Sequence, residues 1–244
     1  MLELNNVTLL AVATVNVQAT IKAMLYSMKD IKYYDAVLVT HEKPENLPEE
    51  ITYKHIDKFD GIDGFNYAMV FEAYKYIESD FALLIHADGF VVNPGSWRNE
   101  FLDYDYIGSP WPLPAPDDKI SFRDPDGKII RVGNSVSIRS RRLMELPDKI
   151  GMPWVPYYGW YNEDGYICVH NHKTFEEHGM KFAPLDVAKY FGHESMLPET
   201  EGIRPFVFHK WSGTNAEYPN FLPQSTFRDR VLGKVKRVLQ HNGR

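Results

Sequence analysis

The chain has 244 residues, of which 44% are hydrophobic and 25% are charged, and its net charge is −6. This length suits one α/β domain around a single core, and the composition is too apolar for a disordered protein. The acidic balance argues against a nucleic-acid-binding protein, which would need a basic face. A single cysteine, Cys168, excludes an internal disulfide framework and favours a reducing compartment.

The apolar segments of the chain are short. None approaches the roughly 20 apolar residues that cross a bilayer. The apolar run at residues 7–13 follows Glu3 and Asn5 rather than a basic segment, so it predicts a first strand and not a signal peptide. We therefore expect a cytoplasmic protein, attached at most to a membrane surface.

The first half alternates between strand and helix patterns. Buried strands are predicted at residues 7–13, 36–39 and 81–85, and a more exposed strand at 51–56. Asn16 is expected to cap a helix in which Ile21, Leu25 and Met28 share one face. Turns at Asp60-Gly61 and Asp63-Gly64 precede a predicted helix at 65–77. This alternation predicts a parallel sheet covered by helices, with a nucleotide-binding half over about residues 1–92.

The second half is richer in loops. We expect loops at residues 110–116 and 124–127, a strand at 132–138, a short helix at 141–146, an aromatic loop at 151–161 and a helix at 162–178 that ends at Gly179. Because no linker or repeat divides the chain, residues 1–222 are predicted to form one domain whose acceptor half spans about 93–222.

Residues 223–244 form a basic tail with an amphipathic pattern. Phe227, Val231 and Leu239 belong to its apolar face, and lysines and arginines occupy the remainder. Such a helix can lie on anionic lipid or pack against its own domain. The sequence leaves both possibilities open.

Asp88 is the first candidate for chemistry. It lies at the carboxyl end of the buried strand at 81–85, which is where open α/β sheets bind ligands. A carboxylate there can hold a divalent cation that neutralises a diphosphate leaving group. The alternative is that Asp88-Gly89 is only a short hairpin turn, and a turn can still present its carboxylate to a ligand.

Glu163 and Asp164 open the helix at 162–178, directly after the aromatic loop. A carboxylate beside an aromatic wall can act as a general base toward a sugar hydroxyl. The alternative is that acidic residues simply favour the first turn of any helix.

Histidines and arginines give weaker signals. His209 lies in the apolar run 206–211 and is either a structural hydrogen-bonding residue or a metal ligand that pairs with a distant segment. His170 and His172 are interpreted as surface residues. A group of arginines flanks Gly133-Asn134-Ser135 and is either a phosphate-binding segment or ordinary surface: Arg131, Arg139, Arg141 and Arg142.

Several segments, taken together, resemble a known family. They lie at residues 85–90, 104–112, 132–143, 162–168, 182–184 and 208–209, in this order. They resemble a mostly uncharacterised family of bacterial and viral proteins classed as glycosyltransferase-like, and the resemblance covers about residues 7–211. It implies an α/β fold of the GT-A type, with a Rossmann-like mixed sheet flanked by helices.

The resemblance also implies roles on the donor side. Asp88 is similar to the remnant of an Asp-x-Asp motif that holds Mn²⁺ or Mg²⁺ against a nucleoside diphosphate, and His209 matches a histidine that completes such a site. His86 stands where the fuller motif has its first acidic residue, which leaves open whether a metal is required. Thr14, Asn16 and Gly89 complete the expected donor site.

On the acceptor side, the Glu163-Asp164 pair is similar to the pair at a helix start in inverting glycosyltransferases, where the aspartate is the base. The sugar pocket is expected to involve Trp111, Asn134 and Trp160. The expected activity is therefore transfer from a nucleotide sugar, most simply a UDP-sugar, to a glycan or lipid-linked hydroxyl.

Two rival hypotheses remain. One is a metal-dependent hydrolase or nucleotidyltransferase that uses His86, Asp88 and His209. The other is a sugar-binding module that keeps the aromatic loops without catalysis.

Overall fold

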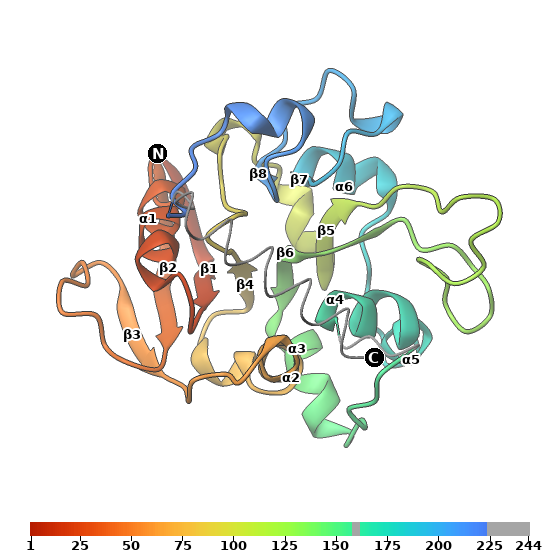
Figure 1. Cartoon of the computed structure of the whole chain (residues 1–244), viewed down its shortest axis with the longest axis horizontal. Helices are drawn as coiled ribbons and strands as arrows, with labels where there is room; N and C mark the ends of the chain where they lie inside the picture. Colours follow the sequence, from red (N-terminus) through yellow and green to blue (C-terminus); the bar gives the residue numbers. More distant parts are fainter. Residues whose placement is uncertain (158–161, 224–244) are drawn as a thin grey trace, which may run out of the picture.

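The structure is a computed structural model that describes residues 1–157 and 162–223. Its main sheet has six strands in the order β3-β2-β1-β4-β6-β5, which cross the molecule from left to right in Figure 1. The strands are β1 (Leu2–Val12), β2 (Ile31–Thr40), β3 (Thr52–His55), β4 (Phe81–Leu84), β5 (Tyr106–Pro110) and β6 (Val132–Ser140). The first four run parallel, whereas β6 is antiparallel to both β4 and β5. The predicted mixed α/β sheet is confirmed.

Helices cover both faces of this sheet. They are α1 (Val17–Ser27), α2 (Ile62–Phe71), α3 (Arg141–Lys149), α4 (Glu163–Gly165), α5 (His172–Glu177) and α6 (Leu185–Phe191). A second sheet of two short parallel strands, β7 (Gly192–His193) and β8 (Val207–Phe208), lies beside β5 and α6. Sequence reasoning did not predict β5, α6 or β7, because these elements are short and lack a clear period, whereas β8 lies in the strand-like apolar run at 206–211.

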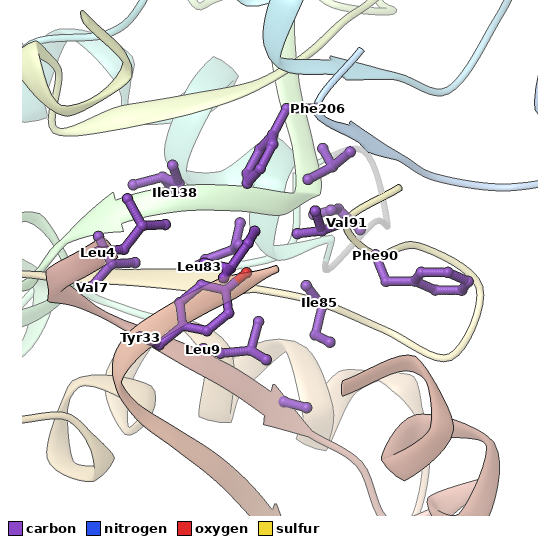
Figure 2. Close-up of a cluster of buried hydrophobic side chains, with 14 of the residues drawn as sticks. Leu4, Val7, Leu9, Tyr33, Leu83, Ile85, Phe90, Val91, Ile138 and Phe206 are labelled. Atoms are coloured by element: carbon purple, nitrogen blue, oxygen red, sulfur yellow. The ribbon is translucent and has the colours of Figure 1, made fainter. Parts of the chain in front are cut away.

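The core has two parts, one on each face of the sheet. Along β1, Leu9 and Ala11 join the part beneath α1 and α6, whereas Leu10 and Val12 join the part beneath α2 and α3. Figure 2 shows the first part, where Leu9 and Leu83 of neighbouring strands lie near Tyr33. Because both faces are buried, the central strands read as continuous apolar runs rather than alternating ones.

Several predicted boundaries need correction in the first half. Asn16 does precede α1, but its backbone is left-handed (φ 53°) and its side chain makes no capping hydrogen bond. Leu25 of the predicted apolar face is 38% exposed, while Met24 is fully buried. The helix predicted at 65–77 begins at Ile62, so Asp63-Gly64 lies inside α2, and a separate 3-10 turn (Ala73–Tyr76) follows it.

The helix predicted at 162–178 is interrupted. A π-helical turn (Tyr166–His170) separates α4 from α5, and the backbone N–H of Asn171 donates to the carbonyl oxygen of Tyr166 at 3.1 Å. Such turns occur often at functional sites. In the described residues, no helix is long and apolar enough to cross a membrane. The predicted amphipathic helix in the tail lies outside the described residues, apart from residue 223.

Candidate functional site

One pocket lies at the carboxyl ends of β1 and β4 and has a volume of about 570 Å³. We call it the donor-side pocket. Five residues that the sequence pointed to line it, although they come from three distant segments: Thr14, Asn16, His86, Asp88 and His209. The carboxyl edge of the sheet is where this class of fold binds ligands.

A tight turn after β4 presents Asp88 to this pocket. The backbone groups of His86 and Gly89 exchange hydrogen bonds of 2.7 and 3.2 Å, so the predicted turn is present. Gly89 closes this turn but does not line the pocket. A Cβ atom at this position would come within 2.5 Å of the Val136 side chain and 2.8 Å of the His209 ring. The glycine therefore permits close packing and does not itself face the pocket.

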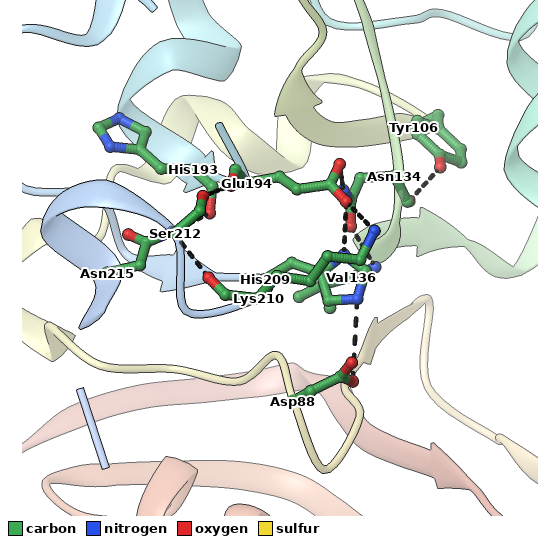
Figure 3. Close-up of polar contacts among 10 residues, drawn as sticks. All are labelled: Asp88, Tyr106, Asn134, Val136, His193, Glu194, His209, Lys210, Ser212 and Asn215. Atoms are coloured by element: carbon green, nitrogen blue, oxygen red, sulfur yellow. Dashed lines mark hydrogen bonds and ion pairs between the residues drawn. The ribbon is translucent and has the colours of Figure 1, made fainter. Parts of the chain in front are cut away.

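Asp88 of this turn and His209 face each other at the wall of the donor-side pocket (Figure 3). The Nε2 atom of His209 is 3.8 Å from Oδ1 of Asp88. His209 follows β8, and its backbone N–H donates to the carbonyl oxygen of His193 at 2.9 Å. The Asp88 carbonyl oxygen accepts from the backbone N–H of Lys210 at 2.8 Å. These backbone contacts fix both residues relative to each other.

His86 differs from the acidic residue that a fuller motif would place here. Burial and, to a smaller extent, the nearby His209 lower the pKa of His86 to about 4, against the opposing effect of Asp88. Its ring meets Phe65 edge to face, with 5.7 Å between centroids. His86 is therefore neutral near pH 7 and does not contribute the charge of a second carboxylate.

In the part of the chain that the structure describes, no group of three or more His, Cys, Asp or Glu side chains is arranged to hold a metal ion. The hydrolase hypothesis, which needs His86, Asp88 and His209 as a ligand set, gains no support from this arrangement. A carboxylate and an imidazole 3.8 Å apart at the wall of a pocket still fit a divalent ion whose remaining ligands come from a bound diphosphate and water.

A second pocket of about 450 Å³ lies beside α4, and we call it the acceptor-side pocket. Its wall is largely aromatic and includes Trp111, Phe122, Trp154, Tyr157 and Tyr166. The Trp111 ring packs directly on Gly133, where a Cβ atom would come within 2.0 Å of the ring. Trp160, the other predicted tryptophan, lies outside the described residues.

Glu163 and Asp164, adjacent in sequence, have different surroundings. Glu163 is buried and forms an ion pair of 3.0 Å with the fully buried Arg139. Burial alone would raise the pKa of Glu163, but the Arg139 guanidinium, the Ser135 side chain and His86 together hold that pKa below its usual range. The resemblance gave the base role to Asp164 and named Glu163 only as a catalytic candidate, and the Glu163 carboxylate is already paired with Arg139. Arg139 is an internal ion-pair partner, and its interpretation as a surface residue is wrong.

Asp164 instead lines the acceptor-side pocket. Burial and, to a smaller extent, the neighbouring charge of Glu163 raise its pKa to about 7. A general base works best when its pKa lies near the working pH. The base role of Asp164 stays a prediction, and the residue lies in the wall of this pocket with a raised pKa.

Asn134 does not line either pocket. Its Nδ2 atom donates to Oε2 of Glu194 at 2.7 Å, and its Oδ1 accepts from the backbone N–H of Val136 at 3.0 Å. Its role is therefore to hold Glu194, which sequence reasoning missed. Glu194 follows β7, lines the acceptor-side pocket and contacts His209 of the donor-side pocket. A glutamate after a two-residue strand gives no sequence signal.

The remaining histidines and arginines are distributed as follows. His172 is buried at 7% exposure against Phe182, so its interpretation as a surface residue is wrong. His170 is half-buried, stacks on Tyr157 and lines the acceptor-side pocket. The other flanking arginines are engaged in ion pairs with carboxylates rather than facing a phosphate site: Arg131, Arg141 and Arg142.

Comparison with solved structures identifies the fold. The chain is similar to the galactosyltransferase LgtC in complex with donor and acceptor sugar analogues, with a TM-score of 0.51 and 12% identity over 93% of this chain and 95% of that one. An active-site mutant of LgtC gives a TM-score of 0.52 at the same identity and coverage. A weaker likeness, with a TM-score of 0.42 and 13% identity over 75% of this chain and 55% of that one, links it to the mannosyltransferase PcManGT from Pyrobaculum calidifontis. The fold is thus of the GT-A type, as the sequence predicted.

No curated protein matches the chain in sequence. A family model does match, over residues 50–209, which is more than half of the chain. The protein therefore belongs to the family described as Protein of unknown function (DUF5672).

Proposed function

We propose that this protein transfers a sugar from a nucleoside diphosphate sugar, most simply a UDP-sugar, to a hydroxyl group of a glycan or lipid-linked acceptor. One observation carries the proposal. The donor-side pocket contains Asp88 and His209, and the acceptor-side pocket contains Asp164. Glu194 connects the two pockets, because it lines the acceptor-side pocket and contacts His209 of the donor-side pocket.

On the donor side, Thr14 and Asn16 line the end of the pocket that follows β1, where a nucleoside would lie. Asp88 and His209 would hold a divalent ion such as Mn²⁺ or Mg²⁺. When bound, such an ion stabilises negative charge that develops on the departing diphosphate. His86 is neutral, so the protein side of this site has one formal negative charge at Asp88.

On the acceptor side, the aromatic wall offers flat apolar surfaces against which a sugar ring can pack. An acceptor hydroxyl beside Asp164 would lose its proton to that carboxylate while its oxygen bonds to the anomeric carbon. The bond from that carbon to the diphosphate oxygen breaks in the same step. Direct displacement of this kind inverts the anomeric configuration, and the two pockets would supply the alignment that it needs.

The first test is a calorimetric screen of UDP, GDP, CMP and their sugars, with and without Mn²⁺. We expect one nucleotide to bind in a metal-dependent manner. At a free nucleotide concentration of ~100 times its Kd, binding should raise the free energy of unfolding by about 2.7 kcal/mol. Asp88→Ala is expected to abolish the metal dependence. The matched control is Asp103→Ala, which removes an exposed aspartate that lines neither pocket. A well-folded protein that binds none of these nucleotides would contradict the donor-site assignment and favour a sugar-binding module.

A further inference from the structure

Glu194 is placed between the two pockets by contacts from several distant segments (Figure 3). Its Oε2 accepts from Asn134 of β6 at 2.7 Å, and its Oε1 pairs with the Lys210 ammonium. The same Oε1 lies 3.4 Å from Nδ1 of His209. The Glu194 side chain is mostly buried, at 17% exposure, and so is that of His209, whereas the Lys210 ammonium reaches it from the exposed side.

The partners of Glu194 are themselves fixed. Asn134 has a φ of 104°, which is rare for a residue other than glycine, and its carbonyl oxygen accepts from the Tyr106 hydroxyl at 2.6 Å. The Ser212 hydroxyl donates to the carbonyl oxygen of Glu194 at 2.6 Å. An unusual backbone conformation that its surroundings hold in place is a common feature of functional sites. The carboxylate therefore has a defined position before any ligand binds.

The Nδ1 atom of His209 faces the Glu194 carboxylate. This nitrogen is buried, and no hydrogen bond of ordinary geometry reaches it from the described residues. The Glu194 carboxylate, at 3.4 Å, is within reach of such a bond if either side chain moves slightly. A neutral imidazole has one protonated and one unprotonated nitrogen, and a carboxylate selects the protonated one.

We propose that Glu194 is a positioning residue that keeps the proton of His209 on Nδ1 and so leaves the unprotonated Nε2 facing Asp88 across the donor-side pocket. Carboxylates that orient a histidine in this way are a general means of preparing an imidazole to bind a cation. The consequence for donor binding rests on the proposed function, whereas the tautomer of His209 does not.

The direct test is the tautomer of His209, observed by ¹⁵N NMR of histidine-labelled protein without metal or nucleotide, at a pH where the ring is neutral. The wild type is expected to show a protonated Nδ1 and an unprotonated Nε2. Glu194→Ala is expected to shift the ring toward the opposite tautomer, which is the more stable one for unconstrained histidine. Glu194→Gln keeps an acceptor oxygen and is expected to retain the wild-type tautomer.

A second readout is the affinity for Mn²⁺ alone, followed by electron paramagnetic resonance of the free ion. Loss of a residue that orients a metal ligand usually weakens metal affinity by about 10–100-fold. We expect a loss of that size in Glu194→Ala and a smaller one in Glu194→Gln. Glu199→Gln is the matched control, because Glu199 pairs with Arg131 at 2.8 Å and lines neither pocket.

The outcomes separate the two proposals. A wild-type His209 with its proton on Nε2 would overturn the positioning role, and that spectrum decides even if Glu194→Ala does not fold. An unchanged tautomer in a folded Glu194→Ala protein would overturn it as well. The predicted tautomers without any Mn²⁺ binding would support the role of Glu194 and count instead against the metal in the proposed donor site.

Discussion

The donor-side and acceptor-side pockets are built in different ways. The donor-side pocket takes most of its named residues from segments that directly follow strands, such as Thr14 after β1, His86 and Asp88 after β4, and His209 after β8. The acceptor-side pocket has aromatic residues and Asp164 in its wall, and the adjacent Glu163 forms an ion pair with the buried Arg139. The first presents a carboxylate and an imidazole at the pocket wall, and the second holds a carboxylate whose pKa is raised to about 7, mainly by burial. Changes that affect one pocket alone test this division.

The strongest expected effect is on the acceptor side, from Arg139→Met. It would leave Glu163 buried without its partner, and removing one member of a buried ion pair typically costs about 3–5 kcal/mol. We expect the free energy of unfolding, measured by urea denaturation, to fall by this amount. Adding Glu163→Leu should recover much of the loss, since a well-packed apolar pair can replace a buried ion pair. A loss below about 1 kcal/mol would show that the pair does not hold α4.

Gly133→Ala is a narrower change to the same pocket. The added Cβ atom would lie 2.0–2.5 Å from atoms of the Trp111 ring, so the ring must move. Overpacking of this kind costs about 1–3 kcal/mol. We expect reduced transfer to acceptor with unchanged nucleotide affinity, measured by calorimetry. Equal losses in both would argue against separate pockets.

Gly89→Ala is the corresponding change on the donor side. Its Cβ atom would lie 2.8 Å from the His209 ring, 2.5 Å from the Val136 side chain and 3.0 Å from the carbonyl oxygen of Phe208. The cost is expected to be about 1–3 kcal/mol, because Val136 is fully buried and the Phe208 carbonyl belongs to the backbone. Here nucleotide affinity should fall while saccharide binding persists. The reverse pattern would contradict the assignment of the two pockets.

The pH dependence of the reaction gives a smaller, graded effect. Asp164 accepts a proton only when ionised, so kcat/KM is expected to rise by up to about tenfold per pH unit below the Asp164 pKa of about 7 and then level off. Its effect on stability has the opposite sign. Because its folded pKa exceeds the unfolded value of about 3.9, folding binds a proton between these values, and this group lowers the free energy of unfolding as pH rises from about 4 to 7.

Asp164→Asn should remove both trends, which pH–rate profiles and urea denaturation at several pH values would reveal.

Glu163 and Glu194 affect the free energy of unfolding in the opposite direction, and they do so at lower pH. Burial alone would raise their pKa values, but Arg139 lowers that of Glu163, and His209 and Lys210 lower that of Glu194 to about 2. Their contribution is present above the unfolded pKa of about 4.3 and is lost as pH falls through their folded values. If Glu163→Gln left the fall in the free energy of unfolding at acidic pH unchanged, that result would contradict the contribution of Glu163.

The sequence predicted most of the sheet, because buried strands read as apolar runs. It also named five residues that line one pocket, because the carboxyl ends of parallel strands share one edge. Asp88 and His209 lie together as expected. The acceptor side was less predictable. Whether Glu163 or Asp164 faces the pocket depends on Arg139, 24 residues away along the chain, and Glu194 matters because Asn134 and His209 reach it from other segments. Such long-range pairings leave no local period or motif.

The central claim is that Asp164 acts on an acceptor while a separate pocket holds the donor. The most direct measurement is acceptor-dependent release of nucleoside diphosphate by the wild type and Asp164→Asn, with donor affinity measured on the same samples. We predict that the substitution lowers the transfer rate by about 10²–10⁴-fold, as expected for a general base, and leaves donor affinity unchanged. An Asp164→Asn protein that transfers sugar at the wild-type rate would contradict the account.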